Sequence, residues 1–440
     1  MTLQESNKIS LINEEQRWKD LRCFTDRTSK FANSGFEPGI QNLKEIHNMP
    51  VLVVGAGGLG CEILKDLALS GFRNIDVIDM DTIDLSNLNR QFLFRESDVG
   101  RSKAEVAAAF VQKRVPGCKV TSHNCRIQDK SLDFYRRFFI IICGLDSIEA
   151  RRWLNATVCS LVEFDDGNQP NPNTIVPLID GGTEGFKGNS RVIIPFMTPC
   201  IQCTIDLYTP QINFPLCTIA HTPRLPEHCV EYVKVVLWEK DKPFGEDVKL
   251  DADDPAHVEW AFRAAQQRAD EYEIRGVDLR LTQGVLKRII PAVASTNAII
   301  SGSCALEALK LASNISCPLR NYLNFANVEG ICFSVIALER NPECLVCGQQ
   351  SVQMYSVSKD WTLGQFLDAL KDKFLLQNPS VRAGDAFLYE INSLMPQMEL
   401  ISRQNLRKTL KELHVVEDSE LLVADEALSK SIILRIKYSK

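Results

Sequence analysis

The chain has 440 residues, of which 45% are hydrophobic and 24% charged, and its formal net charge is −6 at pH 7. The length allows roughly two to four domains, and the composition is that of a globular protein, which excludes general disorder. The negative charge excludes nucleic-acid binding by bulk electrostatics.

Residues 1–49 are polar, with a helical pattern around Glu14–Phe24, and we expect them to form an N-terminal arm. The chain opens on no secretory signal and holds no apolar run long enough for a bilayer, so we expect no membrane partner. The 15 cysteines are then expected to be reduced, with most of them buried and some binding metal or acting in catalysis.

A glycine-rich turn follows the first predicted strand. Residues 51–54 are a short β-branched run, and G-x-G-x-x-G from Gly55 to Gly60 opens a helix with one apolar face. Residues 75–78 predict a second strand, which ends at Asp79. Such a turn brings backbone amides to a phosphate and the acid to ribose hydroxyls, as NAD, FAD and ATP sites require. A tight turn without any ligand has the same pattern.

Strands and helices continue to alternate beyond Asp79, which predicts a mostly parallel sheet covered on both faces. The sequence predicts helices at 103–114 and 147–160 and strands at 119–123, 138–143, 175–180 and 190–194. The last two strands are expected to be separated by the glycine-rich GGTEGFKGN.

The pattern changes after this sheet. Residues 208–282 have the character of an insertion, whose charged stretch 255–274 predicts a helix. Helical patterning and two strands then complete the α/β domain, which we assign to residues 50–207 and 283–350. Residues 351–440 predict a compact mixed sheet with one main helix, which fits a ubiquitin-like β-grasp and nearly as well other α+β folds.

Polar side chains gather after the strands of the sheet. Asn87, Arg90, Gln91 and Lys103 follow Asp79 closely, and Asp146 comes after strand 138–143. Each of these side chains alone is more often a solvated surface group. Together they suit an enzyme that cleaves ATP at the α-phosphate, because cations stabilise the departing pyrophosphate and a carboxylate holds Mg²⁺.

Cysteines suggest two further sites. Two C-x-x-C pairs predict a tetrahedral structural zinc, while a redox dithiol or unrelated core cysteines also fit; the four residues are Cys200, Cys203, Cys344 and Cys347. For a nucleophile, the loop-like surroundings of Cys217 suit an accessible thiolate, but the residues alone leave Cys229 open. His221 fits a surface histidine better than a catalytic one. Cys143 and Cys304 fit core positions.

The segments GAGGLG, IDMDTIDLSNLNRQFLF, GRSKAE and CGLDS resemble the adenylation domain of ubiquitin-like modifier activating enzymes and their bacterial sulfur-carrier relatives, over most of residues 50–350. The resemblance implies a Rossmann-like adenylation domain that uses ATP and Mg²⁺, with zinc at the four cysteines of the C-x-x-C pairs. It assigns Asp146 to magnesium and the following residues to the nucleotide: Gly55, Gly57, Gly58, Gly60, Asp79, Asp81, Asn87, Arg90, Gln91 and Lys103.

The segment FPLCTIAHTPRLPEHCVEYV resembles the catalytic-cysteine segment of these enzymes, which implies a thioester on Cys217 and a mainly helical catalytic-cysteine domain at 208–282. One adenylation unit, a short cysteine insertion and a C-terminal β-grasp resemble the catalytic subunits of the neddylation activating enzymes. SUMO-activating catalytic subunits are the alternative, and a NAD-dependent oxidoreductase is a more remote one. An inactive scaffold subunit is a further rival.

This resemblance also implies the partners. It predicts a heterodimer with a regulatory adenylation-like subunit, a ubiquitin-like modifier as substrate, and a conjugating enzyme recruited through residues 351–440. Arg191 falls where the family has an arginine that disfavours modifiers with a basic residue near the tail. We expect the protein in the cytoplasm and the nucleus.

Overall fold

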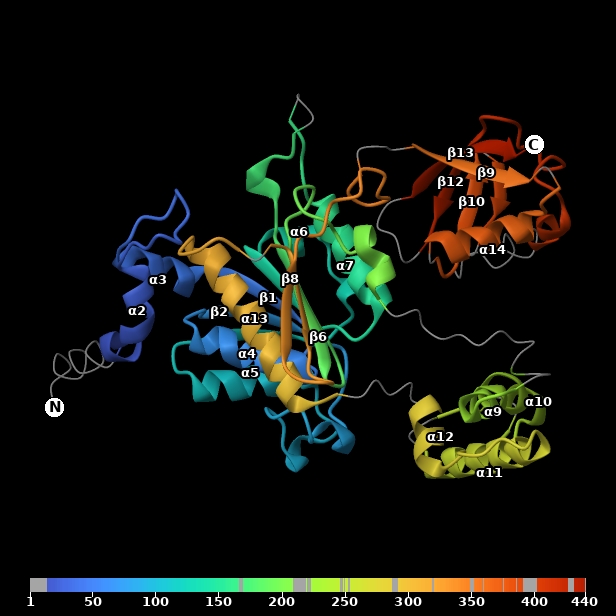
Figure 1. Ribbon diagram of the computed structural model, residues 1–440, viewed down its shortest axis with the longest axis horizontal. Coiled ribbons are helices and arrows are strands. Elements are labelled where there is room, and N and C mark those ends of the chain that lie inside the picture. Colours follow the sequence, from blue (N-terminus) through green and yellow to red (C-terminus); the bar gives the residue numbers. More distant parts are fainter. Residues whose placement is uncertain are drawn as a thin grey trace. The chain divides into compact units, whose positions relative to one another are not determined.

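The chain divides into two compact units, Met1–Leu207 with Ala292–Lys440 and Tyr208–Pro291, and each is described by itself. The computed structural model describes residues 14–165, 169–208, 219, 223–245, 248, 250–251, 254–286, 292–318, 320–348, 352–358, 360–374, 376–384, 386–390, 402–425 and 431–439. The first unit contains an eight-stranded sheet and a five-stranded sheet (Figure 1).

The eight-stranded sheet has the order β3-β2-β1-β4-β5-β6-β7-β8. Its strands are β1 (Pro50–Val54), β2 (Asn74–Ile78), β3 (Lys119–His123), β4 (Ile140–Cys143), β5 (Leu178–Glu184), β6 (Lys187–Ile193), β7 (Tyr322–Ala326) and β8 (Cys332–Ile336). Strands β1 to β5 are parallel, and β5 to β8 pair antiparallel. The chain runs outward from β1 to β3 and returns to β4 on the other side of β1. Ligands of open α/β sheets bind at such a switch point.

Helices cover this sheet because its strands are apolar on both faces. Val51 and Val53 belong to one core cluster with Leu64 of α4 and Ile300 of α13, and the alternate residue Leu52 is equally buried. The helices are α2 (Lys19–Thr25), α3 (Ile40–Asn48), α4 (Gly58–Leu69), α5 (Lys103–Arg114), α6 (Leu132–Arg136), α7 (Ile148–Ser160) and α13 (Ala294–Ser313). Among the helices described, none is both long and apolar enough to span a bilayer.

Short helical turns connect these elements. They lie at η1 (Leu85–Asn87), η2 (Glu96–Asp98), η3 (Ile127–Asp129), η4 (Pro172–Thr174) and η5 (Gln202–Leu207).

The glycine-rich GGTEGFKGN contains the turn between two strands, as expected, but only Gly185 and Phe186 lie outside the strands, which are longer on this side than predicted. Most of it lies within the β5–β6 hairpin, whose pairing continues to Glu184 opposite Lys187. The glycines serve packing: a Cβ at Gly188 would lie 2.5 Å from the Ile300 side chain. Helix α13 therefore packs directly on the hairpin backbone.

The second unit is helical, as expected. It contains α9 (Pro226–Tyr232), the π-helix η6 (Val233–Leu237), α10 (Trp238–Asp241), α11 (Pro255–Glu271) and α12 (Leu279–Leu286). Its core cluster includes Cys229, Ala261 and Leu286. Residue 282, the expected end of the insertion, falls inside α12, and the unit continues to Pro291.

The C-terminal part of the first unit has its own sheet and core. Its elements are β9 (Val352–Ser358), α14 (Leu363–Phe374), β10 (Ser380–Ala383), β11 (Ala386–Tyr389), η7 (Gln404–Arg407), β12 (Glu420–Ala424) and β13 (Ile432–Ser439). The sheet order is β11-β10-β12-β13-β9, with β9 and β13 parallel, and Phe366 and Leu370 of α14 share a core cluster with Leu434. This is the expected ubiquitin-like fold.

Candidate active site

The glycine turn after β1 combines close packing with one open position. Gly55 has a φ of +96°, and a Cβ there would lie 2.9 Å from the Gly144 carbonyl oxygen. A Cβ on Gly60 would overlap the Gly55 carbonyl oxygen at 1.9 Å. Gly57, just before α4, has no heavy atom within 4 Å of the equivalent point. A phosphate therefore has room to approach the amides that open this helix.

Asp79 ties the end of β2 to the glycine turn. Its two carboxylate oxygens accept hydrogen bonds from the backbone N–H groups of Ala56, at 2.6 Å, and Asp81, at 2.8 Å. Burial raises the pKa of this carboxyl group, although both hydrogen bonds act to lower it. Each oxygen retains capacity to accept a further hydrogen bond, which the ribose hydroxyls of a nucleotide can supply.

Lys103 is the first residue of helix α5, and its ammonium group lies at this same edge of the sheet. Its Nζ donates to the Asp81 carboxylate at 2.8 Å, and its backbone N–H donates to the Asp81 carbonyl at 3.0 Å. The Lys103 side chain is 10% exposed and that of Asp81 is 52% exposed. A pair with one solvated partner contributes at most about 1 kcal/mol, so a phosphate can replace Asp81 at little cost.

The segment around η1 carries three more of the expected nucleotide residues. Asn87 accepts from the Asp84 N–H at 3.0 Å and thereby caps η1. Arg90 donates to the Ser86 carbonyl at 2.9 Å. Gln91 is buried, and its Oε1 atom has no hydrogen-bond partner within the part of the chain that the structure describes. A buried acceptor without a partner lowers the stability of the fold unless a ligand donates a hydrogen bond to it.

Asp146 follows β4, on the other side of the switch point from the glycine turn. The neighbouring Gly144 lies against Gly55, and its N–H donates to the Val54 carbonyl at 3.0 Å. The Asp146 side chain is exposed, and among the described residues no hydrogen bond or ion pair involves it. An uncommitted carboxylate at the carboxyl end of a strand is a suitable magnesium ligand.

Three observations therefore indicate that the residues at this edge fit a nucleotide with bound magnesium. These are the open backbone at Gly57, the uncompleted acceptor of Gln91 and the uncommitted carboxylate of Asp146.

Two buried arginines pair with Asp180 of β5, and no pattern in the sequence predicts the first of them. Arg151 of α7 donates to Asp180 at 2.6 Å and to the carbonyl oxygens of Gly181, at 3.0 Å, and Leu145. It thus fixes the loop that carries Asp146. No local pattern marks Arg151, because an arginine in a helix after a core strand has the character of a surface residue.

The second arginine is Arg191, which was expected to select the modifier. Its Nε donates to the fully buried Asp180 carboxylate at 3.1 Å, and it also donates to Thr204 at 2.7 Å. At 3% exposure, Arg191 lies in the interior of the first unit. Its selective role remains a prediction.

Asn297 is a further residue without a sequence signal. Its side chain accepts from Thr183 at 2.6 Å, and its Nδ2 would lie 2.5 Å from a Cβ on Gly58. The Asn297 side chain of α13 therefore packs directly against the start of α4.

The two C-x-x-C pairs meet in one cluster. All four Sγ atoms lie within 4.8 Å of one another, with separations of 3.8 Å for Cys200–Cys203, 3.6 Å for Cys200–Cys344 and 3.3 Å for Cys203–Cys347. Four thiolates at about 2.3 Å from zinc have sulfur–sulfur edges of about 3.8 Å, so the donor set fits a closed tetrahedral site. The alternative of unrelated core pairs is excluded by this geometry.

The expected nucleophile, Cys217, and His221 lie outside the described residues. The alternative, Cys229, is fully buried in the core of the second unit, and burial raises the pKa of its thiol. Its Sγ contacts the Leu225 carbonyl at 3.9 Å. A buried thiol with a raised pKa is inert, so Cys229 is a packing residue.

Comparisons with known proteins agree with this geometry. The chain matches the ThiF family over residues 30–346 and an E2 binding domain over residues 356–438. The NEDD8-activating enzyme E1 catalytic subunit of Caenorhabditis elegans is 60% identical over 423 residues, which cover 96% of this chain and 97% of the relative. The protein of that name in Dictyostelium discoideum is 48% identical over 435 residues, with 96% and 97% covered.

The SUMO-activating enzyme subunit 2 of Dictyostelium discoideum is more distant, with 26% identity over 538 residues that cover 91% of this chain and 79% of the relative. The alternative family is therefore the weaker match. On its ThiF match and its close relatives, this chain belongs to the ThiF family and, within it, to the family of NEDD8-activating enzyme E1 catalytic subunits.

Proposed function

We propose that this protein activates the ubiquitin-like modifier NEDD8 in an ATP-dependent sequence of adenylation, thioester formation and transfer to a conjugating enzyme. The proposal rests on two features at the same switch point, the open glycine turn and the Asp146 carboxylate, which has no partner among the described residues. The match to an E2 binding domain supports the final transfer. A NAD-dependent oxidoreductase would leave both that domain and the cysteine cluster without a role.

In the first step, a carboxylate oxygen of the modifier's C-terminus attacks the α-phosphorus of ATP, and the bond to the bridging oxygen breaks to release pyrophosphate. Lys103 and Arg90 hold the phosphates and offset the charge on the leaving group. Asp79 and Gln91 accept hydrogen bonds from the nucleotide, and Asp146 is the residue that would hold magnesium. The metal supplies further neutralisation of phosphate charge when it is bound.

In the second step, the thiolate of Cys217 attacks the carbonyl carbon of the acyl adenylate, and AMP leaves. The thiol proton must be lost before or during this attack, since the thiolate is the nucleophile. The modifier then passes to the cysteine of the conjugating enzyme by thioester exchange. The domain that begins at β9 recruits that enzyme.

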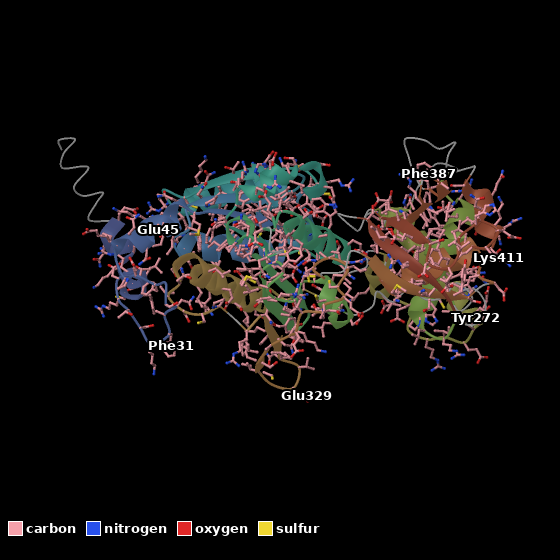
Figure 2. All side chains as sticks on the ribbon, turned by 90° about the horizontal axis from the view of Figure 1, so that it is seen from above. Phe31, Glu45, Tyr272, Glu329, Phe387 and Lys411 are labelled. Atoms are coloured by element: carbon pink, nitrogen blue, oxygen red, sulfur yellow. The ribbon has the colours of Figure 1, made fainter. Side chains whose placement is uncertain are left out.

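An apolar surface on the first unit is the proposed contact for the regulatory subunit. Val328, Ile331, Phe333 and Val335 are 63%, 75%, 55% and 53% exposed, on edge strand β8 and on the loop before it, whose Glu329 is labelled in Figure 2. Exposed apolar side chains on a sheet edge mark a protein interface. Phe333→Asp should separate the two subunits in size-exclusion chromatography, and an unchanged elution volume would argue against this surface.

We also propose that the four clustered thiols hold one structural zinc. Metal analysis of the purified protein should find about one zinc per chain, and Cys203→Ser should remove it, whereas Cys23→Ser, at an exposed cysteine, should not. The cytoplasm and the nucleus are the proposed locations, and fluorescence microscopy of the tagged protein tests them.

The decisive experiment is Cys217→Ala in the assembled enzyme. ATP–pyrophosphate exchange should persist, and the reducible adduct with NEDD8 should disappear from non-reducing gels. Cys317→Ala, at an exposed cysteine, is the control and should keep both activities. An adduct that persists in Cys217→Ala would contradict the assigned nucleophile. Charging of SUMO in preference to NEDD8 would contradict the assigned modifier.

A further inference from the structure

A buried arginine in the second unit lies close to two tyrosine rings. Arg268, in the last turn of α11, is 9% exposed. Its guanidinium carbon lies 3.4 Å from the ring centroid of Tyr232 and 5.0 Å from that of Tyr272, which is labelled in Figure 2. The rings hold the flat guanidinium group through cation–π contact, so its position is fixed by packing.

The third contact of Arg268 reaches the chain beside the catalytic cysteine. One of its terminal nitrogens donates to the Ile219 carbonyl oxygen at 2.7 Å in a buried hydrogen bond. Ile219 is 3% exposed and follows Cys217 by two residues. Two residues of chain span at most about 7 Å, so this carbonyl is a local anchor for the segment that carries the nucleophile.

If this position served packing alone, an arginine would be an energetically unfavourable residue there. Removing a guanidinium cation from water is unfavourable, and a well-packed apolar side chain often stabilises a core as well or better. A buried cation that also donates to the Cys217 segment brings two things that an apolar residue lacks. These are a directed hydrogen bond to the backbone and a positive charge, which favours a thiolate over a thiol.

We infer that Arg268 is a positioning residue for the thioester step, because it holds the chain at Ile219, two residues after Cys217. The inference rests on the proposed function, in which Cys217 forms the thioester. Arg268 itself touches neither the nucleotide nor the modifier in this assignment. Its removal should therefore slow the second step and leave the first unchanged.

The test compares Arg268→Gln and Arg268→Lys in the full-length enzyme with its partner subunit. Arg263→Gln is the matched control, since Arg263 is an exposed arginine of the same helix and its side chain is 76% accessible. Single-turnover formation of the NEDD8 thioester measures the second step, and ATP–pyrophosphate exchange measures the first. Alkylation of Cys217 by iodoacetamide, followed by peptide mass spectrometry, reports on the thiol without any modifier.

We expect Arg268→Gln to slow thioester formation about tenfold to a hundredfold, because small misplacements of a reacting group have effects of this size. Pyrophosphate exchange should stay within about twofold of the wild-type rate, and the alkylation rate of Cys217 should change. Arg268→Lys, which keeps a cation and a donor, should recover part of the lost rate. Arg263→Gln should match the wild type in every assay.

Wild-type thioester rates and alkylation rates in Arg268→Gln would overturn the inference. So would an Arg268→Lys variant that melts like the wild type and yet is as slow as Arg268→Gln, because neither the charge nor a donor would then be sufficient. If Arg268→Gln fails to fold, Arg268→Lys decides alone by its alkylation and thioester rates. A NEDD8 adduct that survives Cys217→Ala overturns the proposed function instead, so the two failures remain distinct.

Discussion

Asp146 is the proposed magnesium ligand at the edge of the sheet where the glycine turn lies. Most other polar side chains at this edge already have protein partners: Asp79 accepts from two backbone amides, and Lys103 pairs with Asp81. Asp146 is exposed and has no such partner among the residues described. A carboxylate without a partner in the described part of the chain is available for a metal ion.

Asp146→Ala should therefore abolish both pyrophosphate exchange and thioester formation, with a loss of at least about a hundredfold in the exchange rate. Its thermal stability should match that of the wild type, because the carboxylate has no hydrogen bond or ion pair with any residue that the structure describes. Asp133→Ala removes a carboxylate that is 85% exposed on α6 and serves as the control. Exchange at the wild-type rate in Asp146→Ala would remove this residue from the metal site.

Some of these residues can be predicted from a local sequence pattern, whereas others depend on partners far away in the sequence. The glycine turn and Asp79 belong to one local pattern, so the sequence predicts their meeting. Arg151 and Arg268 carry no local pattern, since their burial depends on partners contributed by distant segments, such as Asp180 and Ile219. Sequence reasoning assigns such arginines to the surface because isolated cations are rarely buried.

At the scale of elements, helix α4 depends on the absence of a side chain at Gly60. A Cβ there would lie 1.9 Å from the Gly55 carbonyl oxygen, which is backbone and cannot move aside. Gly302 of α13 is the contrasting case, because it is exposed and nothing lies within 4 Å of its Cβ position. The same residue type thus has a packing role in one helix and none in the other.

Gly60→Ala should lower the free energy of unfolding by about 3 kcal/mol, at the upper end of overpacking costs, and should reduce pyrophosphate exchange. Gly302→Ala should raise that free energy by about 1 kcal/mol, since alanine is the better helix former at an unhindered position. Urea unfolding of both variants measures the difference. Equal effects of the two substitutions would mean that α4 shifts to accommodate the methyl group.

A partly buried histidine, His47, contributes to the packing of the N-terminal helices. His47 of α3 donates from Nδ1 to the Gly71 carbonyl at 2.6 Å and packs edge-on against Trp18. Burial lowers the pKa of His47 below its ordinary 6.5, and the positive charge of Arg73 acts in the same direction. In the window between the lowered value and 6.5, the unfolded chain binds more protons than the folded one. Stability therefore falls as the pH drops through that window.

Replacing His47 by Gln should flatten the pH dependence of the melting temperature below pH 6.5, because the titrating group is gone. The wild type should show the steeper decline between pH 7 and pH 5. His414→Gln, at an exposed histidine, is the control variant. A decline of equal slope in His47→Gln and the wild type would assign the acid sensitivity to other groups.

Helices and strands with a clear hydrophobic pattern were predicted with the right bounds, whereas most of a glycine-rich stretch was wrongly interpreted as a loop. The helix at 103–114 and the strand at 119–123 have the predicted bounds, as α5 and β3. The β5–β6 hairpin was misread because its glycines were taken for a loop signal, whereas they admit Ile300 of α13. That requirement comes from tertiary packing, which a single strand does not display in its sequence.

At the scale of the whole molecule, the chemistry is distributed over separately packed cores. The nucleotide edge belongs to the core cluster of β1, α4 and α13, and the helical unit has its own cluster around Val233 and Ala261. The domain from β9 onward has a third, built on Phe366 and Leu434. Loss of one core should therefore leave the steps performed by the others.

Truncation after residue 350 tests this separation, because it removes the domain that matches an E2 binding domain and none of the residues of the other two core clusters. Pyrophosphate exchange and the Cys217 thioester should stay within about threefold of the full-length rates. Transfer to the conjugating enzyme should fall about a hundredfold, since the enzyme must then meet the thioester from free solution without a recruiting site. Stopped-flow mixing of the preformed thioester with the conjugating enzyme measures this rate. Transfer at the full-length rate would show that recruitment lies elsewhere, whereas loss of the thioester itself would show that the cores are interdependent.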